Sequence, residues 1–109
     1  MAGISEFMAL DLRVGRIISA EDHEAARKPM YKLRVYLGPE LGERDIIAGI
    51  KGVYTKEELA GKLVICVANL EPKLIAGAES NGMVLAAEEN GSVSLLEPDK
   101  EMSPGSKIH

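Results

Sequence analysis

The chain has 109 residues, of which 46% are hydrophobic and 28% are charged, and its formal net charge is −4. This length fits a single domain with one core, and no apolar run approaches the roughly 20 residues that span a bilayer. The acidic balance argues against a protein that coats nucleic acid by charge alone, but it leaves room for a local basic stripe.

The N-terminal residues and the single cysteine indicate the cellular setting. Residues 1–15 lack the basic and apolar regions of a signal peptide, so a cytoplasmic location is expected. Cys66 has no partner for an internal disulfide, and its apolar neighbours favour a small buried hydrophobe over a nucleophile. We therefore expect one cytoplasmic domain over residues 1–109, with no membrane partner.

Residues 10–22 form the first predicted strand. Leu10, Leu12 and Val14 alternate with polar residues, and the alternation shifts phase after Gly15. A glycine at such a shift predicts a bulge or a sharp bend in a long strand.

Residues 30–38 form the second predicted strand, whose two faces differ in character. One face carries the apolar residues Tyr31, Leu33, Val35 and Leu37. The other face carries Lys32, Arg34 and Tyr36. This period of two predicts a half-buried strand with a polar outer face.

The middle of the chain predicts two further strands with a short helix between them. The strands cover residues 43–50 and 62–70, and the second of them is apolar on both faces. Between them, Thr55 and Glu58 have the spacing of a capping box, and Gly61 is placed to end the helix.

The last third of the chain predicts a long loop, a hairpin and an irregular tail. Residues 70–81 are rich in turn-forming residues and predict the loop. Residues 82–88 and 92–97 predict a hairpin around the turn signal Asn90-Gly91. Residues 97–109 form a C-terminal extension with two prolines and a glycine.

This order of elements is the plan of an OB-fold. Three strands, a short helix, a fourth strand, the long loop and a final hairpin match a five-stranded OB-fold barrel with its helix between strands three and four. We therefore predict an all-β fold in which the 70–81 loop lies beside the mouth of the barrel.

The residues offer no catalytic or metal-binding pattern. His23 lies among carboxylates, but no second His or Cys stands at ligand spacing, so a solvated loop histidine is favoured over a metal ligand. The sequence has no P-loop, no dinucleotide-binding fingerprint and no nucleophile elbow. We therefore expect a binding module that is not an enzyme and that uses neither a cofactor nor a metal.

Several cationic residues fall on or near the second and third predicted strands: Arg27, Lys28, Lys32, Arg34, Arg44 and Lys51. These two strands carry the usual oligonucleotide face of an OB-fold. Lys32 and Arg34 could hold phosphates while a base stacks on Tyr36. The alternative is a merely solvated strand face, and an aromatic content of 4% makes the pattern by itself favour that alternative.

Five segments carry a resemblance to a known family: LDLRVGRIISAEDH (10–23), KLRVYLG (32–38), IIAGI (46–50), GKLVICVANLEPKLIAGAESNGMVLAA (61–87) and LLEPDKEMSPGSKI (95–108). They are similar to the tRNA-binding domain at the C-terminus of many methionyl-tRNA synthetases. The same EMAP II-like domain occurs as a stand-alone dimeric tRNA-binding protein and within other synthetase chains and their cofactors. Its most specific part here is Asn-Leu-x-Pro-Lys…Gly-x-x-Ser-x-Gly-Met over residues 69–83.

The resemblance implies that the 70–81 loop meets tRNA, with Asn69, Lys73, Ser80 and Met83 at the matching positions. Their chemistry is compatible with RNA, since Lys73 suits a phosphate, Ser80 a sugar or base, and Met83 an unstacked base. The alternative is that Asn69 and Ser80 cap the loop's own backbone and that Met83 belongs to the core.

The resemblance also implies partners and a function. It predicts a non-catalytic domain that reads tRNA by shape and backbone contacts, and a homodimer formed through the segments that flank the barrel, residues 97–109 among them. Such a domain would assist the catalytic part of a methionyl-tRNA synthetase, a ligase, by raising the effective concentration of tRNA. The alternative is a protein-interaction module, either a CsaA-like peptide-binding chaperone or a purely dimerising domain.

Overall fold

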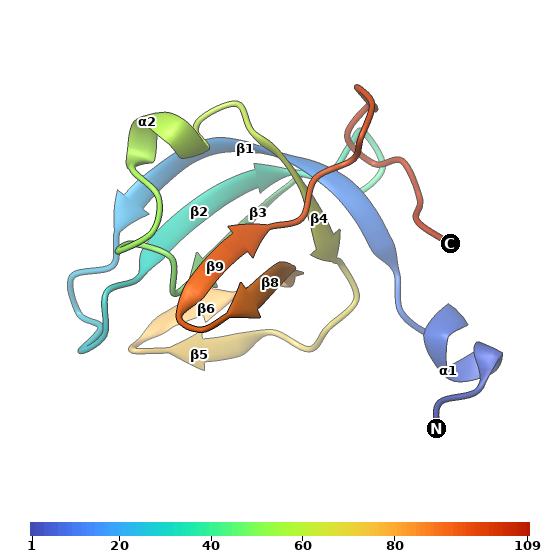
Figure 1. Ribbon diagram of the computed structural model, residues 1–109, viewed down its shortest axis with the longest axis horizontal. Coiled ribbons are helices and arrows are strands. Elements are labelled where there is room, and N and C mark those ends of the chain that lie inside the picture. Colours follow the sequence, from blue (N-terminus) through green and yellow to red (C-terminus); the bar gives the residue numbers. More distant parts are fainter.

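Five strands form one antiparallel sheet in the computed structural model, which describes residues 1–109 (Figure 1). These strands are β1 (Leu12–Asp22), β2 (Tyr31–Tyr36), β3 (Glu43–Ala48), β4 (Leu63–Val67) and β7 (Met83–Val84). They lie in the order β3-β2-β1-β4-β7, and β3 approaches β7, so the sheet is nearly closed into a barrel. The predicted all-β, five-stranded barrel is confirmed.

A short helix, α2 (Lys56–Leu59), lies between β3 and β4, as predicted. Its predicted capping box is present: Thr55 Oγ1 accepts from the Glu58 N–H at 3.2 Å, and Glu58 Oε1 accepts from the Thr55 N–H at 2.8 Å. Leu59 is fully buried, so the helix contributes its last residue to the core.

Strand β1 pairs with a different neighbour along each of its halves, and Gly15 lies just before the change of partner. Residues 12–16 pair with β4, whereas residues 16–22 pair with β2. A Cβ atom added at Gly15 would lie 2.8 Å from Val35 Cγ1 and 2.9 Å from Leu37 Cδ2. The core therefore leaves no room for a side chain at this position.

The irregularity predicted at Gly15 lies further along β1. The register with β2 shifts between Ile17 and Ser19, so Ile18 is the extra residue. A bulge of this kind bends the strand and increases its twist. The phase change in the sequence therefore reports the bulge at Ile18, while Gly15 is required by close packing.

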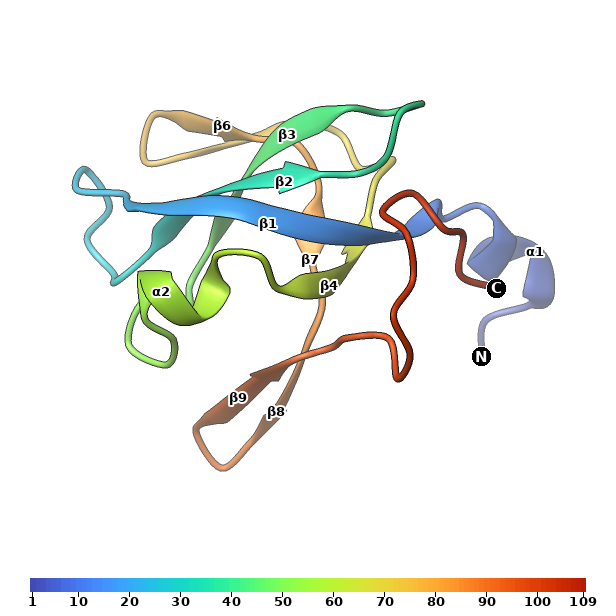
Figure 2. The same ribbon diagram turned by 90° about the horizontal axis from the view of Figure 1, so that it is seen from above.

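Two hairpins extend from the barrel on opposite sides (Figure 2). They are β5 (Lys73–Ile75) with β6 (Ala78–Ser80), and β8 (Ala86–Glu89) with β9 (Ser92–Leu95). The second was predicted, but the strand expected over residues 82–88 divides between β7, which pairs with β4, and β8. The division lets one stretch of chain close the barrel and then leave it.

The β5–β6 hairpin is a correction to the predicted loop over residues 70–81. Its turn is formed by Ala76 and Gly77, with φ values of 50° and 85°. Asn90 and Gly91 adopt nearly the same pair of values, 49° and 84°, in the other hairpin. Positive φ at both central residues is typical of the type I′ turn. An Asn-Gly pair in a sequence predicts a type I′ turn. An Ala-Gly pair does not predict one, because alanine rarely adopts positive φ.

Residues 97–109 run back along the edge of β1 that β2 leaves free. The Gly105 N–H donates to the Val14 carbonyl at 2.8 Å, and the Val14 N–H donates to the Ser106 carbonyl at 2.9 Å. A Cβ atom on Gly38, whose φ is +94°, would lie 2.7 Å from the carbonyl oxygen of Pro104. The C-terminal extension is thus irregular, but it is packed against the barrel.

A second short helix, α1 (Ile4–Met8), precedes β1 and was not predicted from the sequence. None of its residues is buried, and Ile4 and Met8 are 77% and 62% exposed. Both chain termini lie at this end of the molecule, away from the β1–β2 loop (Figures 1 and 2). Neither α1 nor α2 is long and apolar enough to cross a membrane.

The core inside the barrel is built largely from the apolar faces that the sequence pattern predicted. Its fully buried members include Leu33, Val35 and Leu37 from the second predicted strand. Cys66 is also fully buried, and burial raises the pKa of its thiol to about 12. The prediction that Cys66 acts as a small hydrophobe is confirmed.

We expect Gly15→Ala to destabilise the domain by about 1–3 kcal/mol, because Val35 and Leu37 must move to admit the methyl group. Gly52→Ala is the matched control, since no atom lies within 4 Å of an added Cβ there. Urea unfolding of both variants measures the difference. Equal unfolding midpoints for the two variants would contradict the close-packing role of Gly15.

Candidate nucleic-acid interface

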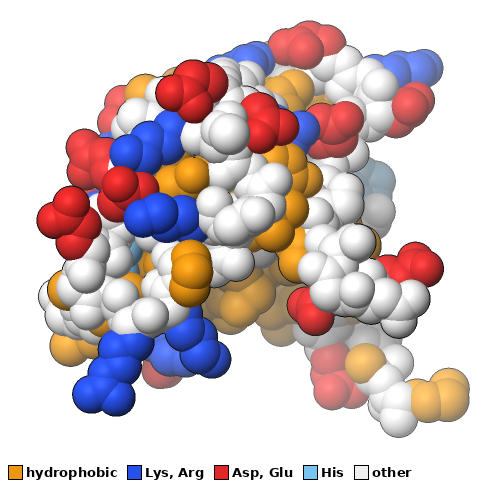
Figure 3. All heavy atoms as spheres, turned by 60° about the vertical axis from the view of Figure 1, so that its left-hand side comes forward, with side chains coloured by type: hydrophobic (Ala, Val, Ile, Leu, Met, Phe, Trp, Pro, Cys, Tyr) orange, Lys and Arg blue, Asp and Glu red, His pale blue; other side chains and the backbone are white.

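Cations without a carboxylate partner gather on the β1–β2 loop, strand β2 and the β5–β6 hairpin. The cations that do form ion pairs are Arg13, Arg16, Arg34, Lys51, Lys56 and Lys62. The unpaired set on these three elements, which we call the basic rim, consists of Arg27, Lys28, Lys32 and Lys73. Figure 3 looks at the end that carries the β1–β2 loop and shows cationic side chains projecting from its lower edge.

The other cations either bond to groups of the protein or lie outside the basic rim. Arg44 donates to the carbonyl of Ala68, and Lys100 and Lys107 belong to the C-terminal extension. Lys51 and Lys56 both contact Asp22, and their hydrogen bonds lower the pKa of that carboxyl. The basic rim is therefore where the acidic chain offers unneutralised positive charge on adjoining elements.

The predicted polar face of β2 is present, but its two cations differ in whether a carboxylate neutralises them. Lys32, Arg34 and Tyr36 alternate with buried residues of β2 and are half-buried. Arg34 donates from Nε to Glu43 at 2.9 Å and from Nη1 to Asp45 at 3.1 Å, and these hydrogen bonds raise the pKa of its guanidinium. Two carboxylates thus neutralise Arg34, while Lys32 has no ion-pair partner.

Lys32 and Lys73 belong to one row of residues that crosses four strands. Lys32 on β2 is opposite Ile47 on β3. The Ile47 N–H donates to Ser80 Oγ at 2.9 Å, and Ser80 on β6 is opposite Lys73 on β5. This chain of contacts fixes the hairpin beside strand β3, the neighbour of β2, through Ile47 and Ser80, which are both buried.

Ser80 and Asn69 use their polar atoms within the chain. Ser80 is only 4% exposed, and its hydroxyl accepts from Ile47 and donates to the Gly82 carbonyl at 3.3 Å. Asn69 Oδ1 accepts from the Asp11 N–H at 2.8 Å, and its Nδ2 donates to the Ala9 carbonyl at 2.7 Å. Both side chains bond to backbone, but all four of their partners lie outside residues 70–81, so they do not cap the loop's own backbone as the alternative interpretation of the sequence suggested.

Lys73 and Met83 are accessible, as a binding role requires. Lys73 is exposed at the start of β5, and Met83 is 50% exposed on β7. Met83 is therefore not the core residue that the alternative reading considered. Leu74, beside Lys73, is 71% exposed, so the hairpin also presents apolar surface next to its cation.

His23 is a feature that the sequence did not reveal. It is 9% exposed rather than solvated, and its Nε2 lies 2.7 Å from the carbonyl oxygen of Ile75. This contact joins the β1–β2 loop to the β5–β6 hairpin. No three His, Cys, Asp or Glu side chains form a group that could hold a metal ion.

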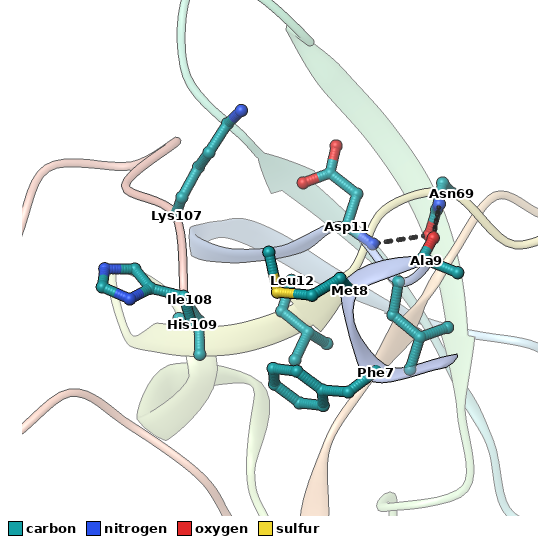
Figure 4. A pocket seen from close by; sticks show the side chains of 10 residues that line it. Phe7, Met8, Ala9, Asp11, Leu12, Asn69, Lys107, Ile108 and His109 are labelled. Atoms are coloured by element: carbon teal, nitrogen blue, oxygen red, sulfur yellow. Dashed lines mark hydrogen bonds between the residues drawn. The ribbon is translucent and has the colours of Figure 1, made fainter. Parts of the chain in front are cut away.

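A second candidate surface lies at the opposite end, where α1 meets the C-terminal extension (Figure 4). Phe7 and Met8 from α1, Leu12 from β1 and Ile108 from the extension line an open, mostly apolar groove. The Asn69 side chain lies at its edge, so the structure places Asn69 here and not with the basic rim.

Residues 12–107 match the family described as "Putative tRNA binding domain". The chain is 52% identical over 106 residues to methionine–tRNA ligase of Methanococcus vannielii, covering 97% of this chain and 16% of that protein. It is 52% identical over 103 residues to the ligase of Pyrococcus horikoshii, covering 94% of this chain and 14% of that one. The chain thus spans about a sixth of the length of these relatives.

Solved structures of similar extent include two kinds of protein. The CsaA chaperone protein of Picrophilus torridus has a TM-score of 0.94 and 40% identity, with 100% of both chains covered. A MetRS-related protein of Pyrococcus horikoshii has a TM-score of 0.89 and 35% identity, with 100% of this chain and 98% of that chain covered. The family match, the relatives and the solved structures agree: the chain belongs to the family of putative tRNA-binding domains related to methionyl-tRNA synthetase.

Proposed function

We propose that this domain binds tRNA through the basic rim and thereby raises the effective concentration of tRNA for a methionyl-tRNA synthetase, either within the same protein or as a partner. The observation that carries the proposal is the gathering of unpaired cations on three adjoining elements of a chain whose net charge is −4. The match to a tRNA-binding family supports RNA as the polyanion.

The chemistry of the rim favours reading of the backbone and shape of a folded RNA. Lysine and arginine side chains contact phosphates without regard to sequence. Tyr36 is the one aromatic on the strand face, so the surface lacks the series of stacking platforms that single-strand binders use.

The predicted site residues take different roles in this proposal. Lys32 and Lys73 contact phosphates, while Tyr36 and Met83 offer surface to an unstacked base. Arg34 contributes less, because Glu43 and Asp45 already neutralise it. Ser80 supports the hairpin from which Lys73 projects, whereas Asn69 fixes the backbone of Ala9 and Asp11 beside the apolar groove.

The domain forms a homodimer through α1 and the groove beside it. A five-residue helix that buries none of its residues has little stability of its own, since short helices depend on packing. The groove and the exposed apolar side chains of α1 lie on the same patch, which suits a two-fold interface in which each copy contacts the other's patch. A second copy is therefore the partner that we assign to this surface.

Peptide binding is the second candidate function. It is favoured by the CsaA chaperone proteins of Picrophilus torridus and Bacillus anthracis, with TM-scores of 0.94 and 0.93 and identities of 40% and 39%. The exposed apolar side chains of Leu74 and Met83 could contact an unfolded chain. The basic rim favours RNA instead, because an apolar peptide has no negative charges to pair with these cations.

We expect folded tRNA to bind more tightly than a single-stranded RNA of equal length or an unfolded peptide. The reason is that the rim has cations for a folded backbone and few aromatics for free bases. Filter binding with all three probes at the same salt concentration measures the preference. Equal affinity for tRNA and the random RNA would contradict shape reading, and tighter binding of the peptide would favour the chaperone function.

We expect Lys73→Ala to weaken tRNA binding several-fold and to reduce the slope of log K against log salt by about one unit, because one phosphate contact is lost. Lys100→Ala removes an unpaired lysine from the C-terminal extension and should leave both quantities unchanged. Binding is measured between about 50 and 200 mM salt. Identical slopes for Lys73→Ala and the parent would remove the hairpin from the site.

We expect the parent protein to sediment as a dimer at micromolar concentration and Met8→Asp to sediment as a monomer with an unchanged melting temperature. A charge on the exposed face of α1 is costly only when a second copy covers it. Leu74→Asp is the matched control, since Leu74 is also largely exposed, 71% against 62% for Met8, but lies on the β5–β6 hairpin. A monomeric parent, or a dimeric Met8→Asp, would disprove this interface.

A further inference from the structure

We infer that His23 is a positioning residue that holds the β5–β6 hairpin against the β1–β2 loop, so that the cations of both present one surface to RNA. The inference rests on the proposed tRNA-binding function. It assigns a role to the one buried histidine of the chain, which neither the core nor the proposed phosphate contacts use.

The first step concerns how His23 itself is fixed. Its backbone closes the β1–β2 loop, since its N–H donates to the Met30 carbonyl at 3.0 Å and its carbonyl accepts from the Ala26 N–H at 3.1 Å. The loop between these contacts carries Arg27 and Lys28. His23 is thus part of the base from which two cations of the rim project.

The second step concerns the side-chain contact. His23 Nε2 lies 2.7 Å from the carbonyl oxygen of Ile75, and a carbonyl can only accept, so Nε2 carries the hydrogen. Because the residue as a whole is only 9% exposed, water has little access to replace this bond. Ile75 is the last residue of β5, directly before the turn, so the bond holds the tip of the hairpin.

The third step concerns what the hairpin would do without that bond. Each of its strands has three residues, and an isolated two-stranded hairpin is marginally stable. Its base is fixed, because Ile47 donates to Ser80 and the Asn81 N–H donates to the Asp45 carbonyl at 2.8 Å. The bond from His23 is the side-chain hydrogen bond at the other end, next to a turn that contains Ala76 at positive φ.

The fourth step connects this geometry to binding. A polyanion that contacts Arg27 or Lys28 and also Lys73 must meet them at a fixed spacing, and each loop that is free before binding must be ordered upon binding. The hydrogen bond from His23 orders the hairpin relative to the β1–β2 loop before RNA binds. Loss of the bond should therefore weaken tRNA binding without changing any charge of the rim.

The experiment compares His23→Gln with His23→Asn. The amide of glutamine is a donor with a reach similar to that of Nε2, whereas the asparagine amide is one methylene too short. We expect His23→Asn to bind tRNA about three- to tenfold more weakly than the parent and His23→Gln to bind nearly as the parent does. We also expect faster amide hydrogen exchange in β5 and β6 of His23→Asn, with exchange in β1–β4 unchanged.

A double-mutant cycle with Lys73→Ala provides the readout that a merely structural role would not alter. If His23 acts by presenting the hairpin, the loss caused by His23→Asn should shrink once Lys73 is absent. Equal affinities of the two His23 variants, or full additivity with Lys73→Ala, would overturn the inference. Failure of the parent itself to bind tRNA would instead overturn the proposed function, and the exchange data would still test whether His23 holds the hairpin.

Discussion

A single strand, β1, holds the barrel together because its two halves pair with different neighbours. Residues 12–16 pair with β4, and residues 16–22 pair with β2, so β1 must pass directly over the core between them. Only a residue without a side chain fits at Gly15, where an added Cβ would lie less than 3 Å from Val35 and Leu37. The close approach of β1 to the core at this point therefore requires glycine, because the interior is already filled.

The course of β1 determines where the two candidate surfaces lie. Its first half leaves one edge without a strand partner, and the C-terminal extension occupies that edge through the hydrogen bonds between Gly105, Val14 and Ser106. This brings the extension next to α1 and creates the apolar groove at one end (Figure 4). The second half of β1 leads to the β1–β2 loop at the other end, and the bulge at Ile18 bends the strand on the way.

Charge pairing then selects which cations remain available for a polyanion. Arg34 lies on the strand face that carries Lys32 and Tyr36, but it is paired with Glu43 and Asp45. Lys51 and Lys56 are likewise held by Asp22. The basic rim therefore contains fewer cations than the stripe in the sequence. It is displaced toward the β1–β2 loop and the β5–β6 hairpin, where Lys73 joins it from a distant part of the chain.

Local patterns in the sequence determined the elements that depend on local physics. The alternation over residues 30–38 reports which side chains face the core, the Thr55–Glu58 spacing reports a capping box, and Asn90-Gly91 reports a type I′ turn. Each of these signals involves residues within a few positions of one another. Ala76-Gly77 has the same pair of φ values without the same signal, because alanine seldom adopts positive φ and therefore does not mark such a turn in a sequence.

The tertiary structure alone decided what the polar residues of the site do. His23 bonds to a carbonyl 52 positions away, Ser80 to an amide 33 positions away, and Asn69 to an amide 58 positions away. The sequence located Asn69, Ser80 and Lys73 through a family pattern, but that pattern does not distinguish a residue that contacts a ligand from one that supports the backbone. The distinction rests on burial and on partners that only the closed barrel brings within hydrogen-bonding distance.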